Sequence, residues 1–282
     1  MRWTPGGVSG NIEDQRDSGG GGGFGFGGRG VGIGGLILAG VLSLIFGRDF
    51  ITPLLFSGGG TTANRQVDQQ RDRAEEPRVQ FVSFVLDDVQ NTWRRVLGDR
   101  YQDAHLVLFR DVVQSACGTA ESATGPFYCP GDHKVYIDLS FFDELDRRFG
   151  APGDFAQAYV IAHELGHHVQ SLVGTSSRVR RLQQANPDEQ NQLSVRLELQ
   201  ADCYAGVWGK STEQRKILDP GDVDEGLAAA ASVGDDRLQR QARGRVNPET
   251  FTHGSSAQRQ YWFKQGFSTG DMKACDTFSS DR

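Results

Sequence analysis

Two histidines one helical turn apart, His163 and His167, constrain what this chain can fold into and do more than any other feature of its sequence. Residues of an α-helix are about 100° apart, so both imidazoles project from one face and can bind a single Zn²⁺. Glu164 follows His163 directly, where it can take a proton from a metal-bound water without ligating the metal. We therefore expect a zinc site in which Glu164 is the general base.

The residues around this motif favour a buried helix that begins at Asp154. Apolar residues recur there at helical spacing, and both histidines lie mainly off the stripe that they form; its members are Phe155, Ala158, Ile161, Ala162, Leu165 and Val169. The bare motif also occurs by chance, and a satisfied core histidine is the alternative for each ring. That alternative explains one histidine, but not two at i and i+4 with a carboxylate between them.

A catalytic zinc site needs a third protein ligand. One route continues the motif with a Gly and a third His, but Gln170 and Val173 occupy those positions and exclude it. The other route takes a Glu from a later helix, and Glu198 with Asp202 forms another i, i+4 pair that can face the site. We expect Glu198 to bind zinc and Asp202 to accept the remaining ring N–H of His163. A solvated helix face is the alternative for this acidic pair.

The rest of the apolar patterning predicts a mixture of helices and strands, and therefore an α+β class. Residues 188–205 alternate in part as a strand would, but no Pro or Gly interrupts them and an apolar line continues at helical spacing, so a helix is preferred. The other predicted elements are helices over 78–97, 222–241 and 255–266, and strands over 106–109 and 135–139.

Four sequence blocks together resemble the YpfJ-like bacterial neutral zinc metallopeptidases, a membrane-anchored group with gluzincin-like sites. The blocks are residues 125–130 (GPFYCP), 163–170 (HELGHHVQ), 198–208 (ELQADCYAGVW) and 273–278 (KACDTF). The resemblance covers nearly the whole chain. It implies a small sheet packed on the histidine-bearing helix, a second ligand-bearing helix, one zinc ion per chain, and peptides or proteins as substrates.

The resemblance also implies roles for two further parts of the chain. Gluzincin-like sites use a histidine downstream of the ligand Glu to stabilise the developing oxyanion, and His253 is the candidate; a structural histidine at a helix entry is the alternative. A strand just upstream of the active-site helix commonly pairs with an extended peptide. Val135, Tyr136 and Ile137 would supply that edge here, and an ordinary edge strand is the alternative.

The first third of the chain divides by composition into three segments. Residues 1–30 are expected to form a glycine-rich, flexible N-terminus on the cytoplasmic side. Residues 31–47 are largely uncharged and apolar or glycine, and predict a single transmembrane helix; a cleaved signal peptide and a buried helix are the alternatives. Residues 48–77 are expected to form a polar tether. The catalytic domain, residues 78–282, would then lie on the periplasmic side of the bacterial inner membrane.

All four cysteines fall in the predicted domain, which suits an oxidising compartment. Three pairings are possible. We expect Cys117 to pair with Cys129 across a local loop, which leaves Cys203 on the ligand helix to pair with Cys275. Four buried thiols are the alternative, and the spacing disfavours a zinc role.

Two other classes of function remain open from the sequence. A peptide deformylase also has this histidine motif but takes a Cys as its third ligand, and Cys117 is the candidate; a disulfide at Cys117 would exclude that class. A catalytically silent, zinc-stabilised membrane protein that acts by binding is the other. The net charge of −6 gives no reason to expect a nucleic-acid partner.

Overall fold

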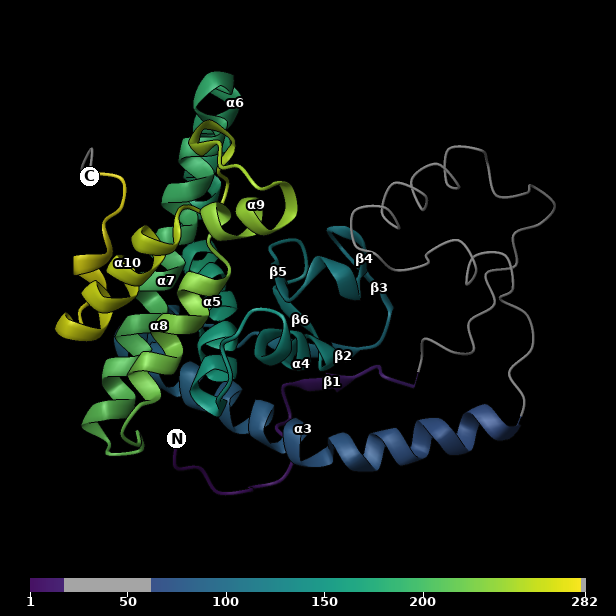
Figure 1. The fold of residues 1–282 in the computed structure, drawn as a ribbon. Coiled ribbons are helices and arrows are strands. Elements are labelled where there is room, and N and C mark those ends of the chain that lie inside the picture. Colours follow the sequence, from purple (N-terminus) through teal and green to yellow (C-terminus); the bar gives the residue numbers. More distant parts are fainter. Residues whose placement is uncertain (18–61, 280–282) are drawn as a thin grey trace, which may run out of the picture.

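The computed structural model of the chain describes residues 1–17 and 62–279 and has an α+β class, as predicted (Figure 1). Its α-helices are α3 (Thr62–Leu97), α4 (Ser140–Arg147), α5 (Asp154–Leu172), α6 (Thr175–Ala185), α7 (Gln190–Gln214), α8 (Asp222–Ser232), α9 (Asp235–Arg243) and α10 (Ser256–Thr269). Its strands are β1 (Ile12–Asp14), β2 (His105–Phe109), β3 (Val112–Ser115), β4 (Gly118–Glu121), β5 (Phe127–Cys129) and β6 (Lys134–Asp138).

The main sheet is small and mixed, with the strand order β1-β2-β6-β5. β1 and β6 are parallel to β2, whereas β5 runs antiparallel to β6. β3 and β4 form a separate antiparallel hairpin. Strands β2 and β6 match the two strands that the apolar runs predict.

Alternating side chains of β2 and β6 divide between two apolar clusters, as the period of a strand requires. Leu106 and Ile137 belong to the large core, which also contains the apolar faces of α3, α5 and α7. Val107 and Tyr136 point to the opposite face and pack with Val113 of the hairpin. The sheet therefore lies between the helices and the hairpin, and α5 packs directly beside it (Figure 1).

Helices α7 and α10 cross at a point where neither has a side chain. A Cβ on Gly206 would lie 2.1 Å from the Phe263 carbonyl oxygen, and a Cβ on Gly266 would lie 1.9 Å from the Cys203 carbonyl oxygen. Glycine at both positions lets the two backbones touch. This contact fixes the position of α10 against the helix that carries Glu198.

Residues 1–17 correct the expectation of a flexible segment over residues 1–30. Ile12 to Asp14 pair as β1 with Leu106 to Leu108, and the Trp3 ring packs edge-on against Phe81 with 5.3 Å between centroids. The glycine tract on which the expectation rested starts only at Gly19, whereas residues 1–17 include apolar side chains that can be buried. Residues 18–30 lie outside the described part of the chain.

Charged contacts also fix residues 1–17 on the domain. The Arg16 guanidinium is buried and lies 2.9 Å from the Glu75 carboxylate of α3, and the Lys134 ammonium lies 2.7 Å from the Glu13 carboxylate. The amino group of Met1 donates to Asp154 at the first turn of α5 over 2.6 Å. Residues 1–17 and the predicted catalytic domain thus form one packed body, so within one molecule they cannot lie on opposite sides of a membrane.

Two boundaries also differ from those predicted. Residues 62–77, expected within a polar tether, form the first part of α3, and the helix continues through Pro77. The predicted helix over 222–241 is two helices that separate at Val233 and Gly234. A Cβ on Gly234 would lie 2.4 Å from the Ser256 backbone nitrogen, so this turn packs against the start of α10.

Within residues 1–17 and 62–279, no helix combines the length and apolar composition needed to cross a membrane. The predicted span, residues 31–47, lies outside the described residues.

Candidate zinc site

The structure brings together the three residues that the sequence predicts as metal ligands. His163 and His167 project from α5, and Glu198 projects from α7 towards both rings. The Nε2 atoms of the histidines lie 3.2 and 3.4 Å from the Glu198 carboxylate oxygens. One ligand atom from each residue falls within 4.8 Å of the other two. Two imidazole nitrogens and a carboxylate oxygen are a donor set that Zn²⁺ favours, so the residues fit a zinc ion.

Gly166 explains how α5 and α7 come close enough to share this site. It lies between the two histidines in sequence and faces α7. A Cβ there would lie 3.1 Å from the Cα of Ala201, which is itself between Glu198 and Asp202. The absence of a side chain on Gly166 therefore sets the distance across which the histidines reach Glu198.

The Asp202 carboxylate contacts His163 at Nδ1, the ring nitrogen that does not face Glu198. His163 Nδ1 lies 2.9 Å from Asp202 Oδ1, which matches the predicted role of Asp202. The same carboxylate accepts two hydrogen bonds from Arg259 of α10, at 2.8 and 2.9 Å, and one from the Tyr159 hydroxyl. A carboxylate so bonded accepts the proton on Nδ1 of His163, so that Nε2 is the ring nitrogen that can bind a metal.

Charges around this carboxylate set its protonation and that of His163. Burial alone would raise the pKa of Asp202, but the charges of Arg259 and His163, together with their hydrogen bonds, outweigh burial and lower that pKa. Burial would lower the pKa of His163, but the charge of Asp202, with hydrogen bonds to Asp202 and Glu198, raises that pKa to about 10. Burial would raise the pKa of Glu198, but the neighbouring histidines hold it well below its usual range. Both carboxylates are therefore ionised.

His167 is held by an amide rather than by a carboxylate. Its Nδ1 lies 2.9 Å from Oε1 of Gln170, one turn further along α5. The sequence indicates neither this contact nor those of Tyr159 and Arg259. Tyr159 and Gln170 lie four residues before His163 and three after His167, so helical spacing could have found them. Arg259 is 57 residues from Asp202 and carries no such signal.

Glu164 is buried beside the histidines. Its residue is 8% exposed, and burial raises the pKa of its carboxyl above the ordinary value. A carboxylate with a raised pKa retains a proton more readily once it has accepted one, which suits a group that must first take and then release a proton.

His253 lies in the turn between α9 and α10, which packs against α7 near Glu198. Oxygen Oδ2 of Asp235 accepts hydrogen bonds from the backbone N–H groups of Thr252, His253 and Gly254, at 2.7, 2.7 and 3.1 Å. A hydrogen bond to Asp235 is the main cause that raises the pKa of His253, and the charge of Glu198 contributes. The His253 side chain is 52% exposed.

The prediction that Val135, Tyr136 and Ile137 form an edge strand for a substrate peptide is wrong. These residues lie on β6, which is an interior strand: it pairs with β2 along its whole length and with β5 from Lys134 to Tyr136. Hydrogen bonds to both neighbours leave little of its backbone for a peptide. The edge strand on that side of the sheet is β5, and its Tyr128 hydroxyl lies 3.1 Å from Nδ1 of His168 on α5.

Both expected disulfides are present. Cys117 is bonded to Cys129, and Cys203 on α7 is bonded to Cys275 in the short helix η6 (Met272–Cys275). An oxidised Cys117 cannot serve as a thiolate ligand, so the deformylase alternative is excluded.

Comparison with known proteins gives the family of the chain. The family described as "Putative neutral zinc metallopeptidase" matches residues 1–278. YpfJ of Escherichia coli K12 is 47% identical over 284 residues, which cover 99% of each chain. Rv2575 of Mycobacterium tuberculosis H37Rv is 48% identical over 203 residues, which cover 68% of each chain. No solved structure matches. The chain therefore belongs to the neutral zinc metallopeptidase family.

Proposed function

We propose that this protein is a zinc-dependent peptidase with a gluzincin-like site, in which His163, His167 and Glu198 hold the metal and Glu164 is the general base. The observation that carries the proposal is the convergence of both Nε2 atoms on Glu198, at 3.2 and 3.4 Å, with the buried Glu164 carboxylate alongside. A solvated helix face, the alternative for Glu198, does not account for a carboxylate directed at two imidazoles.

Each residue of the site has a separate role in the proposed peptide hydrolysis. A zinc ion bound there would supply a Lewis acid that polarises the scissile carbonyl and lowers the pKa of a bound water. Glu164 accepts the proton of the attacking water and then delivers it to the leaving amine. Asp202 keeps His163 in the tautomer that ligates through Nε2.

His253 is the proposed donor to the oxyanion that develops on the scissile carbonyl. Two observations support this role. Asp235 holds the backbone of the turn through three N–H groups, which limits how far the ring can move, and it raises the pKa of His253, which favours a ring that can donate. A donor that is already oriented stabilises the transition state without reorganisation.

An extended peptide bound at the outer edge of β5 would lie beside α5. β5 ends the sheet on the side that contacts α5, and the outer edge of such a strand can pair with a further strand. A peptide or protein substrate is therefore the proposed class, with β5 in place of β6 as the strand that orients it.

We propose that the domain works in an oxidising, extracytoplasmic compartment and is attached to the membrane through residues 31–47. Two disulfides support the compartment. Because residues 1–17 are packed on the domain, they would lie on that same side.

A peptide-library digest analysed by mass spectrometry tests the proposed activity. Zinc-loaded wild type should cleave library peptides, and Glu164→Gln with the same zinc content should be slower by orders of magnitude, because it binds metal but cannot accept a proton. Equal digestion by the two proteins would remove Glu164 from the mechanism. No digestion by fully loaded wild type would favour the silent binding protein.

A further inference from the structure

We propose that a chain of side-chain amides positions His167 as a metal ligand, and that the disulfide between Cys203 and Cys275 holds the far end of this chain. The chain runs from His167 through Gln170 and Gln200 to the backbone carbonyl of Cys275. The proposal rests on the zinc site proposed above. It assigns a role in metal binding to residues that do not touch the metal.

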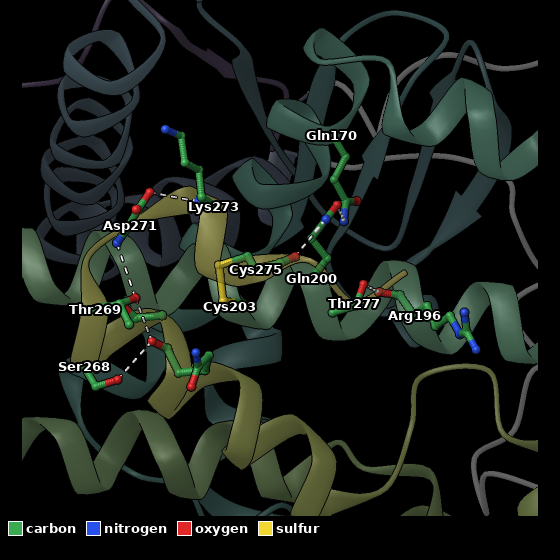
Figure 2. Close-up of a disulfide and its surroundings, with 12 residues drawn as sticks. Gln170, Arg196, Gln200, Cys203, Ser268, Thr269, Asp271, Lys273, Cys275 and Thr277 are labelled. Carbon is green, nitrogen blue, oxygen red and sulfur yellow. Dashed lines mark hydrogen bonds between the residues drawn. A yellow bond between two sulfur atoms is a disulfide. The ribbon is translucent and has the colours of Figure 1, made fainter. Parts of the chain in front are cut away.

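Each step of the chain is a hydrogen bond between described residues, and Figure 2 shows its last two. His167 Nδ1 lies 2.9 Å from Gln170 Oε1. Nε2 of Gln170 donates to Oε1 of Gln200 over 3.2 Å, and Nε2 of Gln200 donates to the Cys275 carbonyl over 2.9 Å. Gln170 is fully buried and Gln200 is 6% exposed, so water does not compete for these groups.

Two backbone carbonyls fix the direction of every bond in the chain. Nε2 of Gln170 also donates to the carbonyl of Leu197 over 2.7 Å. A carbonyl only accepts, so each Gln must turn its NH₂ group towards its carbonyl. Oε1 of Gln170 then faces His167, and the ring must carry its proton on Nδ1. The opposite nitrogen, Nε2, is left with a lone pair directed at the site shared with Glu198.

The Cys275 carbonyl is a fixed end point because the segment around it is tied to α7 at two places. The disulfide joins Cys275 to Cys203, which is three residues after Gln200. The Thr277 hydroxyl donates to the Arg196 carbonyl over 2.6 Å (Figure 2). Loss of the disulfide removes the covalent tie, so the carbonyl can move and Gln200 loses the partner that sets its orientation.

The nitrogen of His167 that binds zinc can be read in the zinc-loaded protein by ¹⁵N nuclear magnetic resonance. We expect Nε2 on the metal and a proton on Nδ1 in wild type, and an Nδ1 proton that exchanges faster with water in Gln170→Met, which keeps the length and loses the amide. Zinc on Nδ1 of His167 in wild type, or equal exchange rates in the two proteins, would overturn the proposal. This measurement does not require activity. Absence of zinc binding by wild type would instead overturn the proposed function.

The rate at which zinc dissociates into a chelator tests the remaining hydrogen bonds of the amide chain. Gln170→Met should weaken zinc binding by about 10- to 100-fold, as expected for a group that orients a ligand, and Gln200→Met by a smaller factor. Gln192→Met is the matched control, because Gln192 is an exposed glutamine of the same helix and should leave dissociation unchanged. Equal dissociation rates in Gln200→Met and wild type would overturn the chain beyond Gln170.

A double-mutant cycle separates the chain from a general loss of stability. Replacing Cys203 and Cys275 by Ala should speed zinc dissociation in wild type, and by a clearly smaller factor in Gln200→Met, where the connection is already broken. The same factor in both backgrounds would mean that the disulfide acts only through stability, and would overturn its assigned role.

Discussion

At the scale of residues, the two histidines are oriented by different chemistry. A carboxylate that also bonds Arg259 holds His163, whereas a neutral amide holds His167. An ionised acceptor makes the stronger hydrogen bond. Loss of the Asp202 carboxylate should therefore weaken zinc binding more than loss of the Gln170 amide, and each should have a smaller effect than loss of a ligand itself.

The zinc content of purified variants should distinguish the roles of Glu198 and Asp202. Glu198→Ala removes one of three protein ligands, so we expect it to lose zinc during purification. Asp202→Ala should keep zinc but bind it about 10- to 100-fold more weakly. Elemental analysis of the purified variants, followed by competition with a chelator, measures both effects. Equal zinc in Glu198→Ala and wild type would mean that another residue is the third ligand.

His253→Ala should lower kcat by roughly 10²- to 10³-fold if the ring donates to the oxyanion. Zinc content and melting temperature should stay near wild-type values, because the backbone of the turn, not the ring, makes most of the bonds to Asp235. Steady-state kinetics with a peptide identified in the digest gives kcat. A large drop in melting temperature would indicate a structural histidine instead.

Helical spacing predicts the ligands and the carboxylate that faces them, but not every residue that holds them. His163 with His167 and Glu198 with Asp202 can be paired through helical spacing alone. Arg259 cannot, because only the crossing of α10 over α7 brings it to Asp202. Gln170 lies within one turn of His167, but nothing in the sequence distinguishes its amide as the group that reaches the ring.

At the scale of elements, the crossing of α7 and α10 holds the site together. Gly266→Ala would place a methyl group 1.9 Å from the Cys203 carbonyl oxygen, so the helices must separate. We expect a loss of about 1–3 kcal/mol in the free energy of unfolding. Thermal and chemical denaturation measure it. Gly10→Ala is the control, because a Cβ at Gly10 meets nothing within 4 Å. Equal stability of the two variants would contradict this contact.

The sequence predicts helices and strands well where apolar residues repeat regularly. It predicts them poorly where contacts between distant parts of the chain set the boundary of an element or its neighbours. The strands β2 and β6 and the helix α5 follow from their own patterns. The sequence of β6 gives no sign that β2 and β5 pair on both of its sides, and its pattern is equally compatible with an edge strand. The break after α8 depends on Ser256 packing against Gly234, which no local pattern reports.

At the scale of the whole molecule, the position of residues 1–17 constrains how the chain meets a membrane. The glycine-rich composition of residues 19–30 suggested that the whole N-terminus is flexible, but β1 completes the sheet. The apolar run at 31–47 therefore separates two parts of one folded body.

Cysteine labelling of spheroplasts tests that arrangement. Gly10→Cys and Glu249→Cys both place a thiol at an exposed position, one before residues 31–47 and one after them. We expect a membrane-impermeant maleimide to label both in spheroplasts before lysis. Labelling of Glu249→Cys alone before lysis would contradict the packing of residues 1–17. Labelling of both only after lysis would contradict the extracytoplasmic location and leave the packing intact.

The most direct test of the central claim is a zinc titration of the metal-stripped full chain, with peptide cleavage followed at each step. The proposed site predicts that wild type regains cleavage in proportion to bound zinc and reaches its maximum at one ion per chain, whereas Glu164→Gln takes up the same zinc and stays inactive. Cleavage that is independent of bound zinc, or that Glu164→Gln regains equally, would contradict the claim.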